Sequence, residues 1–351
     1  MELKEIQSDQ KGIWNSFVGG HKFGHFLQCF EWGDVLLADG QTIKRLAVFD
    51  KRQIIATSLV MKFPLPLNKS YAYMPRGPIM NWQHIHKQGK INKDQEALIM
   101  LLDEAKKFGQ KENALFLRID PEIEHEDIHP EFWHQIGFIK APKENQPKRT
   151  TVVDLELPED LLLKAMKSKT RYNIRLASRK GVKIKKSTNR SDIKYFYDLM
   201  LITSKRDKFY AHSKKHYEDI IKILGPENLT KIFLAEHKGK IISANIISLF
   251  GQKAIYLHGA SADEYRNLMP TYLLQWEAIL EAKKSGCKFY DFGGVVSEEE
   301  TKHSWAGISR FKRGFGGKEK EFIGAWDLPY SGSQYRLFSF TNTIRRKIKG
   351  L

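Results

Sequence analysis

The sequence contains an internal repeat that limits the folds open to it. The hexapeptide EAKKFG at Glu104 to Gly109 returns as EAKKSG at Glu281 to Gly286. Each copy closes a helical pattern with a glycine in the C′ position, and the short apolar run that follows reaches Asp120 or Asp291. Two segments of alternating polar and apolar residues precede each helix, as β-strands do. We therefore expect a duplicated α/β fold with mixed sheets, in which each half reads strand, strand, helix, strand.

Length and charge set the class of protein and of partner. With 351 residues, 41% of them hydrophobic, the chain is long enough for two domains, and the polar, proline-containing stretch 141–150 suits a linker between them. Lysine and arginine exceed the acids to give a formal net charge of +17. This excess favours partners rich in phosphate, such as nucleic acid, nucleotides or an anionic membrane face. A charge that serves only solubility is the alternative.

The cellular compartment follows from cysteine usage and from the apolar runs. Cys29 and Cys287 are the only cysteines, so a disulfide framework is not expected. The first ten residues, MELKEIQSDQ, have no apolar core of a signal peptide, and no window of the sequence holds 18 uninterrupted apolar residues. We expect a cytoplasmic protein without a membrane span.

The strongest basic run lies at 164–190, where eleven basic residues occur without an acid. A helix from Leu161 to Lys180, ended by Gly181, would bury one apolar stripe and leave the cations outside. Like charges four residues apart on a helix repel each other, so this face suits phosphate, although a merely solvated face is the alternative. The candidate RNA-binding residues are Lys167, Lys169, Arg171, Arg175, Arg179 and Lys180.

Two familiar motifs are weakened by their context. HEDIH, His125 to His129, fits the H-E-x-x-H zinc pattern, but Pro130 pushes His129 out of the α region, and no metal is expected. RNLMPT, Arg266 to Thr271, stands where an acetyltransferase of the GNAT type would cradle coenzyme A with R/Q-x-x-G-x-G/A. Bulky side chains and Pro270 would obstruct that cradle, so no coenzyme is expected.

Eight blocks spread over almost the whole chain carry a family resemblance. In order they are FLQCFEWG, PRGPI, TRYNIRLASRKGV, TSKRDKFY, YLHGAS, PTYLLQWEAI, FYDFGG and RFKRGFGG. Together they resemble the Fem family, the FemX-like aminoacyltransferases that build peptidoglycan cross-bridges. The resemblance implies tandem GNAT-like domains: 1–149, completed by the C-terminal segment 322–351, and 150–321. It also implies transfer of an amino acid from aminoacyl-tRNA to the stem-peptide amine of a precursor, either UDP-MurNAc-pentapeptide or lipid II.

The resemblance assigns the catalytic pair to RFKRGFGG. The family's phenylalanine and lysine fall on Phe311 and Lys312, and the lysine would face the ester carbonyl of the aminoacyl-tRNA. Amine attack on that ester makes a tetrahedral oxyanion, which a nearby cation stabilises. Phe311 could stack on the terminal adenosine, and Gly314, Gly316 and Gly317 would permit the turn that aims the pair. A basic turn with a packed phenylalanine is the alternative.

Precursor contacts and a general base are also implied. The family's arginine and tyrosine fall on Arg206 and Tyr210, and Tyr256 is a further candidate. Where the family often has a lysine, this chain has Leu36. Lys44 and Arg76 are therefore the candidates to hold the nucleotide or pyrophosphate of the precursor. Asp120 is the candidate base by its position at a strand end, with Asp291 as its counterpart. Either carboxylate could instead cap backbone donors, and the substrate itself could take the proton.

The remaining expectations concern partners and rivals. The segment after Pro329 is a helix candidate with five basic residues and no acid, which could touch an anionic membrane or tRNA. The chain lacks a long helical insertion between Arg206 and Lys240, as in compact Fem relatives, and we expect a monomer, placed in the cytoplasm or at the inner face of the plasma membrane. The rival functions are a GNAT acyltransferase that uses acyl-CoA and a non-catalytic RNA-binding protein.

Overall fold

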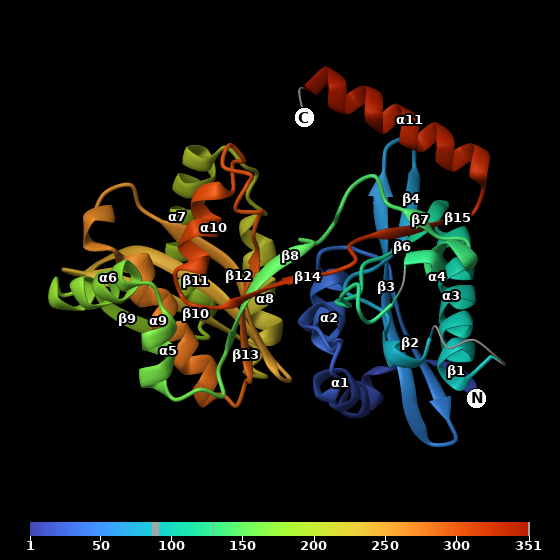
Figure 1. The fold of residues 1–351 in the computed structure, drawn as a ribbon, viewed down its shortest axis with the longest axis horizontal. Helices are drawn as coiled ribbons and strands as arrows, with labels where there is room; N and C mark the ends of the chain where they lie inside the picture. The colour runs from blue at the N-terminus through green and yellow to red at the C-terminus, as the bar shows by residue number, and fades with distance from the viewer. Residues whose placement is uncertain (86–90, 129, 350–351) are drawn as a thin grey trace. The chain divides into compact units, whose positions relative to one another are not determined.

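The computed structural model describes residues 1–85, 91–128 and 130–349, and these divide into two compact units (Figure 1). Unit 1 comprises Met1–Lys148 and Glu321–Leu351, and unit 2 comprises Arg149–Lys320. Each unit contains one mixed β-sheet with helices packed on it. The expected α/β class with mixed sheets is confirmed. His129, the second histidine of HEDIH, lies outside the described residues.

Unit 1 is built on an eight-stranded sheet in the order β1-β2-β3-β4-β6-β15-β7, with β5 paired to β3. Its strands are β1 (Glu2–Glu5), β2 (Ile43–Asp50), β3 (Gln53–Leu65), β4 (Lys69–Met74), β5 (Ile79–Met80), β6 (Ala114–Ile119), β7 (Ile139–Lys140) and β15 (Trp326–Pro329). Its helices are α1 (Lys11–Gly20), α2 (Phe30–Ala38), α3 (Lys93–Lys111), α4 (Pro130–Gln135) and α11 (Gly332–Lys349). Strand β15 enters between β6 and β7, antiparallel to both, so the end of the chain forms part of this sheet.

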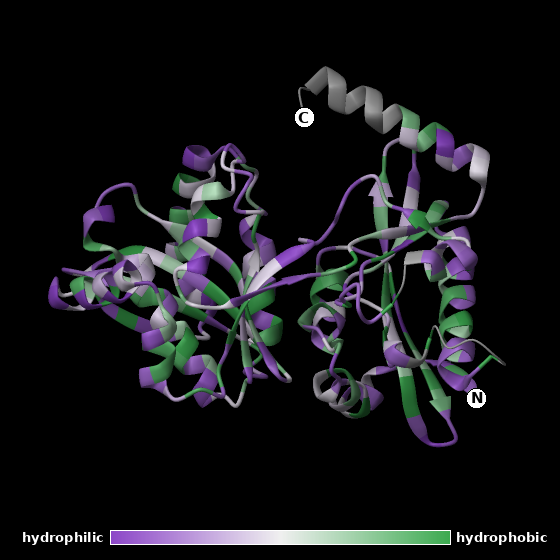
Figure 2. Cartoon of the chain, in the orientation of Figure 1, coloured by the Kyte–Doolittle hydropathy of each residue, from purple (hydrophilic) through white to green (hydrophobic). Residues whose placement is uncertain are grey.

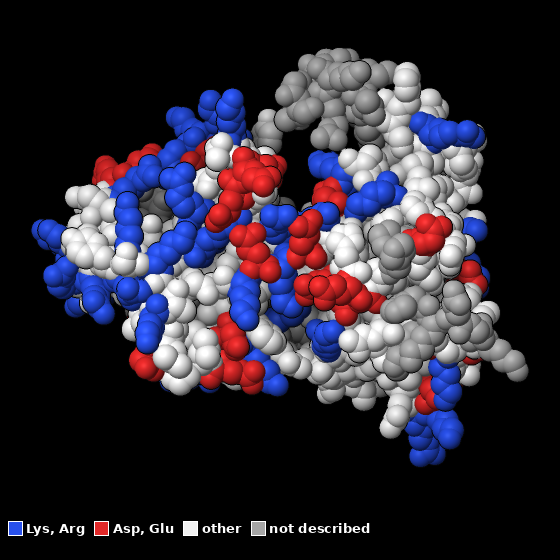
Figure 3. All heavy atoms as spheres, viewed as in Figure 1, with Lys and Arg blue, Asp and Glu red and all other residues white. Residues whose placement is uncertain are grey.

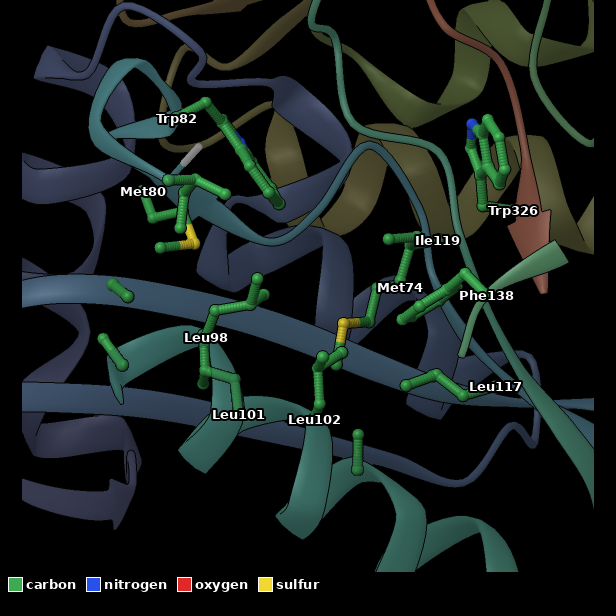
Figure 4. Packing of buried hydrophobic residues seen from close by; sticks show 14 of the residues in the cluster. Met74, Met80, Trp82, Leu98, Leu101, Leu102, Leu117, Ile119, Phe138 and Trp326 are labelled. Carbon is green, nitrogen blue, oxygen red and sulfur yellow. The ribbon is translucent and has the colours of Figure 1, made fainter. Parts of the chain in front are cut away.

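Helix α3 shows how the sequence specifies the core of unit 1. Asn92 caps its N-terminus in a reciprocal capping box with Gln95. Hydrophobic and hydrophilic residues alternate around the helix (Figure 2), and Leu98, Leu101 and Leu102 face the strands (Figure 4). Burial of each such leucine stabilises the fold by roughly 1.5–3 kcal/mol. The crossover through α3 makes β4 and β6 parallel neighbours.

Unit 2 repeats this arrangement on a seven-stranded sheet in the order β14-β8-β13-β12-β11-β10-β9. Its strands are β8 (Arg149–Asp154), β9 (Lys183–Ser187), β10 (Thr230–His237), β11 (Lys240–Phe250), β12 (Lys253–Ser261), β13 (Phe289–Gly294) and β14 (Lys318–Glu321). Its helices are α5 (Glu159–Ala165), α6 (Ser168–Arg179), α7 (Ile193–Asp207), α8 (Lys214–Leu224), α9 (Pro270–Lys284) and α10 (Ala306–Arg313). Helix α9 joins the parallel pair β12 and β13 as α3 joins β4 and β6, so the expected order of strand, strand, helix, strand holds in both halves.

The two repeat glycines turn out to have different roles. Gly286 has a φ of +83° just beyond α9, as a C′ glycine should. Gly109 instead lies inside α3, which continues to Lys111, so the prediction of a helix end at Gly109 is wrong. A Cβ at Gly109 would come within 2.3 Å of the Tyr330 hydroxyl oxygen. The absence of a side chain at this position therefore serves close packing.

The basic helix also differs from its prediction. The expected single helix from Leu161 to Lys180 is two helices, α5 and α6, because Met166 has an extended conformation, with ψ of 151°. The break allows the Lys167 N–H to donate to the Gly314 carbonyl at 2.9 Å. Gly181, with φ of +79°, ends α6 as expected.

The cysteines and the longest helices were also expected from the sequence to be informative. Cys29 and Cys287 are both free and buried. Over residues 1–85, 91–128 and 130–349, no helix combines the length and the apolarity that crossing a membrane requires.

Candidate active site

The catalytic candidate Lys312 is a buried cation in unit 2. It lies in helix α10, so the prediction that Phe311 and Lys312 occupy a turn is wrong. Its side chain is directed inward, where Nζ donates to the Gly294 carbonyl oxygen at 2.7 Å and lies 5.9 Å from the centre of the Tyr256 ring. Burial lowers the pKa of Lys312 to about 8, although the Asp291 carboxylate opposes the shift. Lys312 is therefore mostly protonated at neutral pH and loses its charge as pH rises through about 8.

Asp291 organises the backbone that receives Lys312. Its carboxylate accepts hydrogen bonds from the Gly293 N–H at 2.7 Å and from the Thr150 hydroxyl. The ladder between β13 and β8 shifts register between Asp291 and Gly294, and Gly293 has a φ of +68°. Asp291 therefore stabilises the irregular end of β13. At this end, the Gly294 carbonyl oxygen accepts a hydrogen bond from the Lys312 ammonium. Sequence patterns do not indicate the Thr150 contact, because that residue lies 141 positions from Asp291.

The glycines after Lys312 serve close approach of the backbone. A Cβ at Gly314 would lie 2.5 Å from the Thr170 hydroxyl oxygen, and one at Gly316 would lie 2.5 Å from the Ala165 carbonyl oxygen. Gly316 alone among the three glycines of this segment has a positive φ, at +84°. These positions let the segment after α10 pass against the ends of α5 and α6.

The aromatic residues around Lys312 are packed together. Phe311 is half-buried, with its ring centre 5.0 Å from that of Tyr272 and 5.3 Å from that of Phe315, both in edge-to-face geometry. Burial raises the pKa of Tyr256 to about 12. Gly259 lies against the Tyr256 hydroxyl, since a Cβ there would come within 1.7 Å of it. The Tyr256 phenol therefore stays protonated at neutral pH as a potential hydrogen-bond donor.

Arg206 and Tyr210 lie at the end of α7. The Arg206 guanidinium donates to Asp207 at 3.0 and 3.1 Å and to Asp263 at 2.8 Å, and its bond to Asp207 raises its pKa. It also reaches the Ser261 carbonyl of β12 at 3.1 Å. Tyr210 is fully exposed in the segment that follows. A substrate anion that binds the Arg206 guanidinium would have to displace the carboxylates of Asp207 and Asp263, both of which are largely exposed.

Unit 1 contains a second cluster of buried charged groups around the candidate base. Asp120 follows β6 and accepts hydrogen bonds from the Tyr73 hydroxyl and from the Arg76 N–H, both at 2.7 Å. Burial raises the pKa of Asp120 to about 6, against the nearby charge of Arg76. Asp120 thus caps a backbone donor, one of the two roles expected from sequence, and its pKa also suits a base at neutral pH.

Arg76 adopts a left-handed backbone conformation with φ of +54°, and its side chain is 5% exposed. Its guanidinium donates to the Pro147 carbonyl at 2.8 Å and lies 3.6 Å from the Glu122 carboxylate. Glu122 in turn lies 3.4 Å from His25 Nε2, so this carboxylate connects Arg76 to His25, a link that sequence analysis missed. Lys44 instead pairs with Glu104 at 2.9 Å and with Glu5 at 3.4 Å.

The basic face of α6 is largely exposed, and Lys and Arg gather over α6 and β9 in Figure 3. Exposed cations on or next to α6 are Lys167, Lys169, Arg175, Arg179 and Lys180. Arg171 differs, because its guanidinium donates to carbonyls at the end of α5, including that of Met166. A hollow of about 880 Å³ runs between α6 and α9, with Tyr172, Arg175 and Trp276 in its lining.

The structure also describes the start of α9, where a coenzyme A cradle was considered, and part of the HEDIH motif, where a zinc site was considered. Helix α9 begins at Pro270, which offers no N–H to a phosphate. Asp127 of the HEDIH motif accepts a hydrogen bond from Lys22 at 3.2 Å. Across the described part of the chain, no group of three or more histidine, cysteine or acidic residues is arranged to hold a metal ion.

Comparison with known proteins gives a consistent result. The sequence profile of the FemAB family matches residues 11–132, 132–238 and 226–343. A lipid II:glycine glycyltransferase of Staphylococcus epidermidis is 24% identical over the full length of both chains, and one of Staphylococcus aureus is 24% identical over 92% of each. The crystal structure of FemX superposes with a TM-score of 0.84 at 23% identity, covering 97% of this chain and 100% of that one. A tandem GNAT protein from the clavulanic acid pathway gives 0.55 at 11% identity, covering 94% and 99%, so the duplicated GNAT-like fold is confirmed.

Proposed function

Because the chain belongs to the FemAB family, we propose that it transfers an amino acid from aminoacyl-tRNA to the stem-peptide amine of a peptidoglycan precursor. The staphylococcal relatives, which are glycyltransferases that act on lipid II, support a lipid-linked acceptor. The free, buried cysteines suit a reducing cytoplasm, where we place the reaction. The enzyme acts as a monomer and needs neither a metal nor a coenzyme.

The burial of Lys312 is the observation that carries the proposal. The attacking amine forms a bond to the ester carbonyl carbon, and the carbonyl oxygen becomes an oxyanion before the bond to the ribose oxygen breaks. An ammonium held in a buried site by the Gly294 carbonyl stabilises that oxyanion more strongly than an exposed lysine would. Phe311 presents its half-buried ring to the terminal adenosine.

The remaining roles are assigned to groups of matching chemistry. Asp120, with its pKa near 6, accepts the proton that the attacking ammonium loses. Arg206 and Arg76 bind phosphate or carboxylate groups of the precursor, and Tyr210 and Tyr256 add hydrogen bonds. The exposed cations of α6 contact the tRNA backbone.

The direct test supplies purified protein with a mixture of charged tRNAs and either lipid II in detergent or UDP-MurNAc-pentapeptide. The expected product is a precursor whose mass has grown by one or more amino-acid residues. Transfer from an acyl-CoA in the absence of tRNA would instead establish the acyltransferase rival. RNA binding without any transfer to either precursor would establish the non-catalytic rival.

The α6 assignment predicts a change in salt dependence. Replacing Lys169, Arg175 and Arg179 together with glutamine should weaken tRNA binding and lower the slope of log affinity against log salt by about 2 to 3, since each lost phosphate contact contributes close to one. Filter binding between 50 and 200 mM salt measures this slope. Replacing Lys51, Lys69 and Lys238, which are exposed lysines outside α6, is the matched control. An unchanged slope in the α6 variant would remove this face from the tRNA site.

A further inference from the structure

Helix α11 is anchored to unit 1 by one of its faces. Tyr335 is 5% exposed, and its ring meets Phe116 of β6 edge to face at 5.2 Å. Phe338 lies 5.1 Å from the same ring, and the Tyr335 hydroxyl donates to Asp327 at 2.6 Å. These contacts fix the rotation of the first turns of α11 about the helix axis.

The fixed rotation leaves an apolar stripe uncovered. Leu337 and Phe340, one helical turn apart, are 65% and 64% exposed. Exposed single hydrophobic residues are common, but two of them with helical spacing on a basic helix indicate a binding surface.

Charge distinguishes among the possible occupants of this stripe. Residues 332–351 contain five basic residues and no acid. A second copy of the chain would bring two such basic segments together and repel. RNA would neutralise the cations but would leave the Leu337 and Phe340 side chains without an apolar partner. A helix with an apolar stripe and a cationic polar face is the form that lies in the surface of an anionic membrane.

We propose that α11 is a membrane-docking helix, which inserts Leu337 and Phe340 among the acyl chains of an anionic bilayer while its basic residues contact the lipid phosphates. The inference deepens the proposed function, because docking would place the enzyme where a lipid-linked precursor is anchored. The contact is peripheral and reversible, since a single amphipathic helix supplies it.

Vesicle binding tests the inference without donor or acceptor. The full chain is sedimented with vesicles of phosphatidylglycerol and phosphatidylcholine, 1:1, or of phosphatidylcholine alone. We expect binding to the anionic vesicles, about tenfold or more weakened in the double variant Leu337→Gln, Phe340→Gln, and little binding to the neutral ones. Leu201→Gln is the matched control, because Leu201 is 48% exposed on α7. Equal binding of the double variant and the wild type would overturn the proposal.

Further measurements separate this inference from its alternatives. Loss of a concentration-dependent dimer in the double variant, seen by light scattering, would assign the stripe to a second copy. Weakened tRNA affinity with unchanged vesicle binding would assign it to RNA. The double variant should process UDP-MurNAc-pentapeptide at the wild-type rate but lose activity on lipid II in anionic vesicles. If no variant transfers amino acids but vesicle binding still depends on Leu337 and Phe340, the docking role stands and the proposed function fails.

Discussion

Lys312→Ala is expected to lower the rate of aminoacyl transfer by about 10²- to 10³-fold, equivalent to about 3–4 kcal/mol of transition-state stabilisation. The reason is that the ammonium, bonded to the Gly294 carbonyl inside unit 2, is the charge that meets the developing oxyanion. Single-turnover transfer with saturating enzyme measures the effect on chemistry. Affinity for tRNA should stay within about twofold, since Lys312 is 8% exposed and outside the basic face of α6.

The matched control is Lys318→Ala, which removes an exposed lysine of β14 six residues further along the chain. Its rate should equal that of the wild type. Circular dichroism of both variants shows whether unit 2 remains folded. A folded Lys312→Ala protein with the wild-type rate would contradict the assignment of Lys312, whereas the family and fold would be unaffected.

The lowered pKa of Lys312 gives the same assignment a pH signature. The ammonium is the active form of Lys312, and burial lowers its pKa to about 8. The fraction of enzyme with a charged Lys312 is therefore high below that pH and falls as pH rises through it. Transfer should therefore decline above pH 8 after subtraction of spontaneous ester hydrolysis. The uncharged variant Lys312→Met should retain only a low rate without this decline. A wild-type rate that stays level to pH 9.5 would exclude the ammonium as the stabilising group.

The fold was predictable where local sequence patterns and tertiary structure agree. Alternating segments became β3 and β11, and the EAKK helices became the crossovers α3 and α9, because parallel strands require such a connection. The predicted helix end at Gly109 was wrong because a tertiary contact, and not the local pattern, determines the residue at this position. Nothing local distinguishes a glycine that ends a helix from one that makes room for Tyr330, which is 221 residues away.

The site was predictable in its residues and less so in their setting. The sequence identified Lys312 and Phe311 but placed them in a turn, since the glycines that follow suggested one. Their helix α10 packs on partners that are distant in the sequence, with Phe311 against Tyr272 of α9 and Lys312 against the Gly294 carbonyl. The position of Asp291 at a strand end was predicted from the repeat, whereas its bond to Thr150 depends on the pairing of β13 with β8. Long-range polar partners of this kind have no signal in a single sequence.

A further long-range pair is Arg118 with Asp327, which lie 209 positions apart and join β6 to β15. The guanidinium donates two hydrogen bonds of 2.7 Å to the carboxylate, and the side chains are 5% and 0% exposed. Burial alone would lower the pKa of Arg118, but its bonds to Asp327 and the charge of Asp327 raise it. The Tyr335 hydroxyl donates to the same carboxylate, so the pair also supports the anchor of α11.

Asp327→Ala is expected to lower the free energy of unfolding of unit 1 by about 3–5 kcal/mol, because it leaves the Arg118 charge buried without its partner. Urea unfolding followed by tryptophan fluorescence measures the loss, since Trp82, Trp133 and Trp326 lie in the core of that unit. The double variant Arg118→Met, Asp327→Leu should lose less than the single variant, because neither side then retains an unpaired charge. Glu2→Ala, which breaks an exposed pair with Lys4, should change stability by less than about 1 kcal/mol. If Asp327→Ala unfolds like Glu2→Ala, the pair does not hold β15 in the sheet, and the C-terminal segment must be retained by its apolar contacts alone.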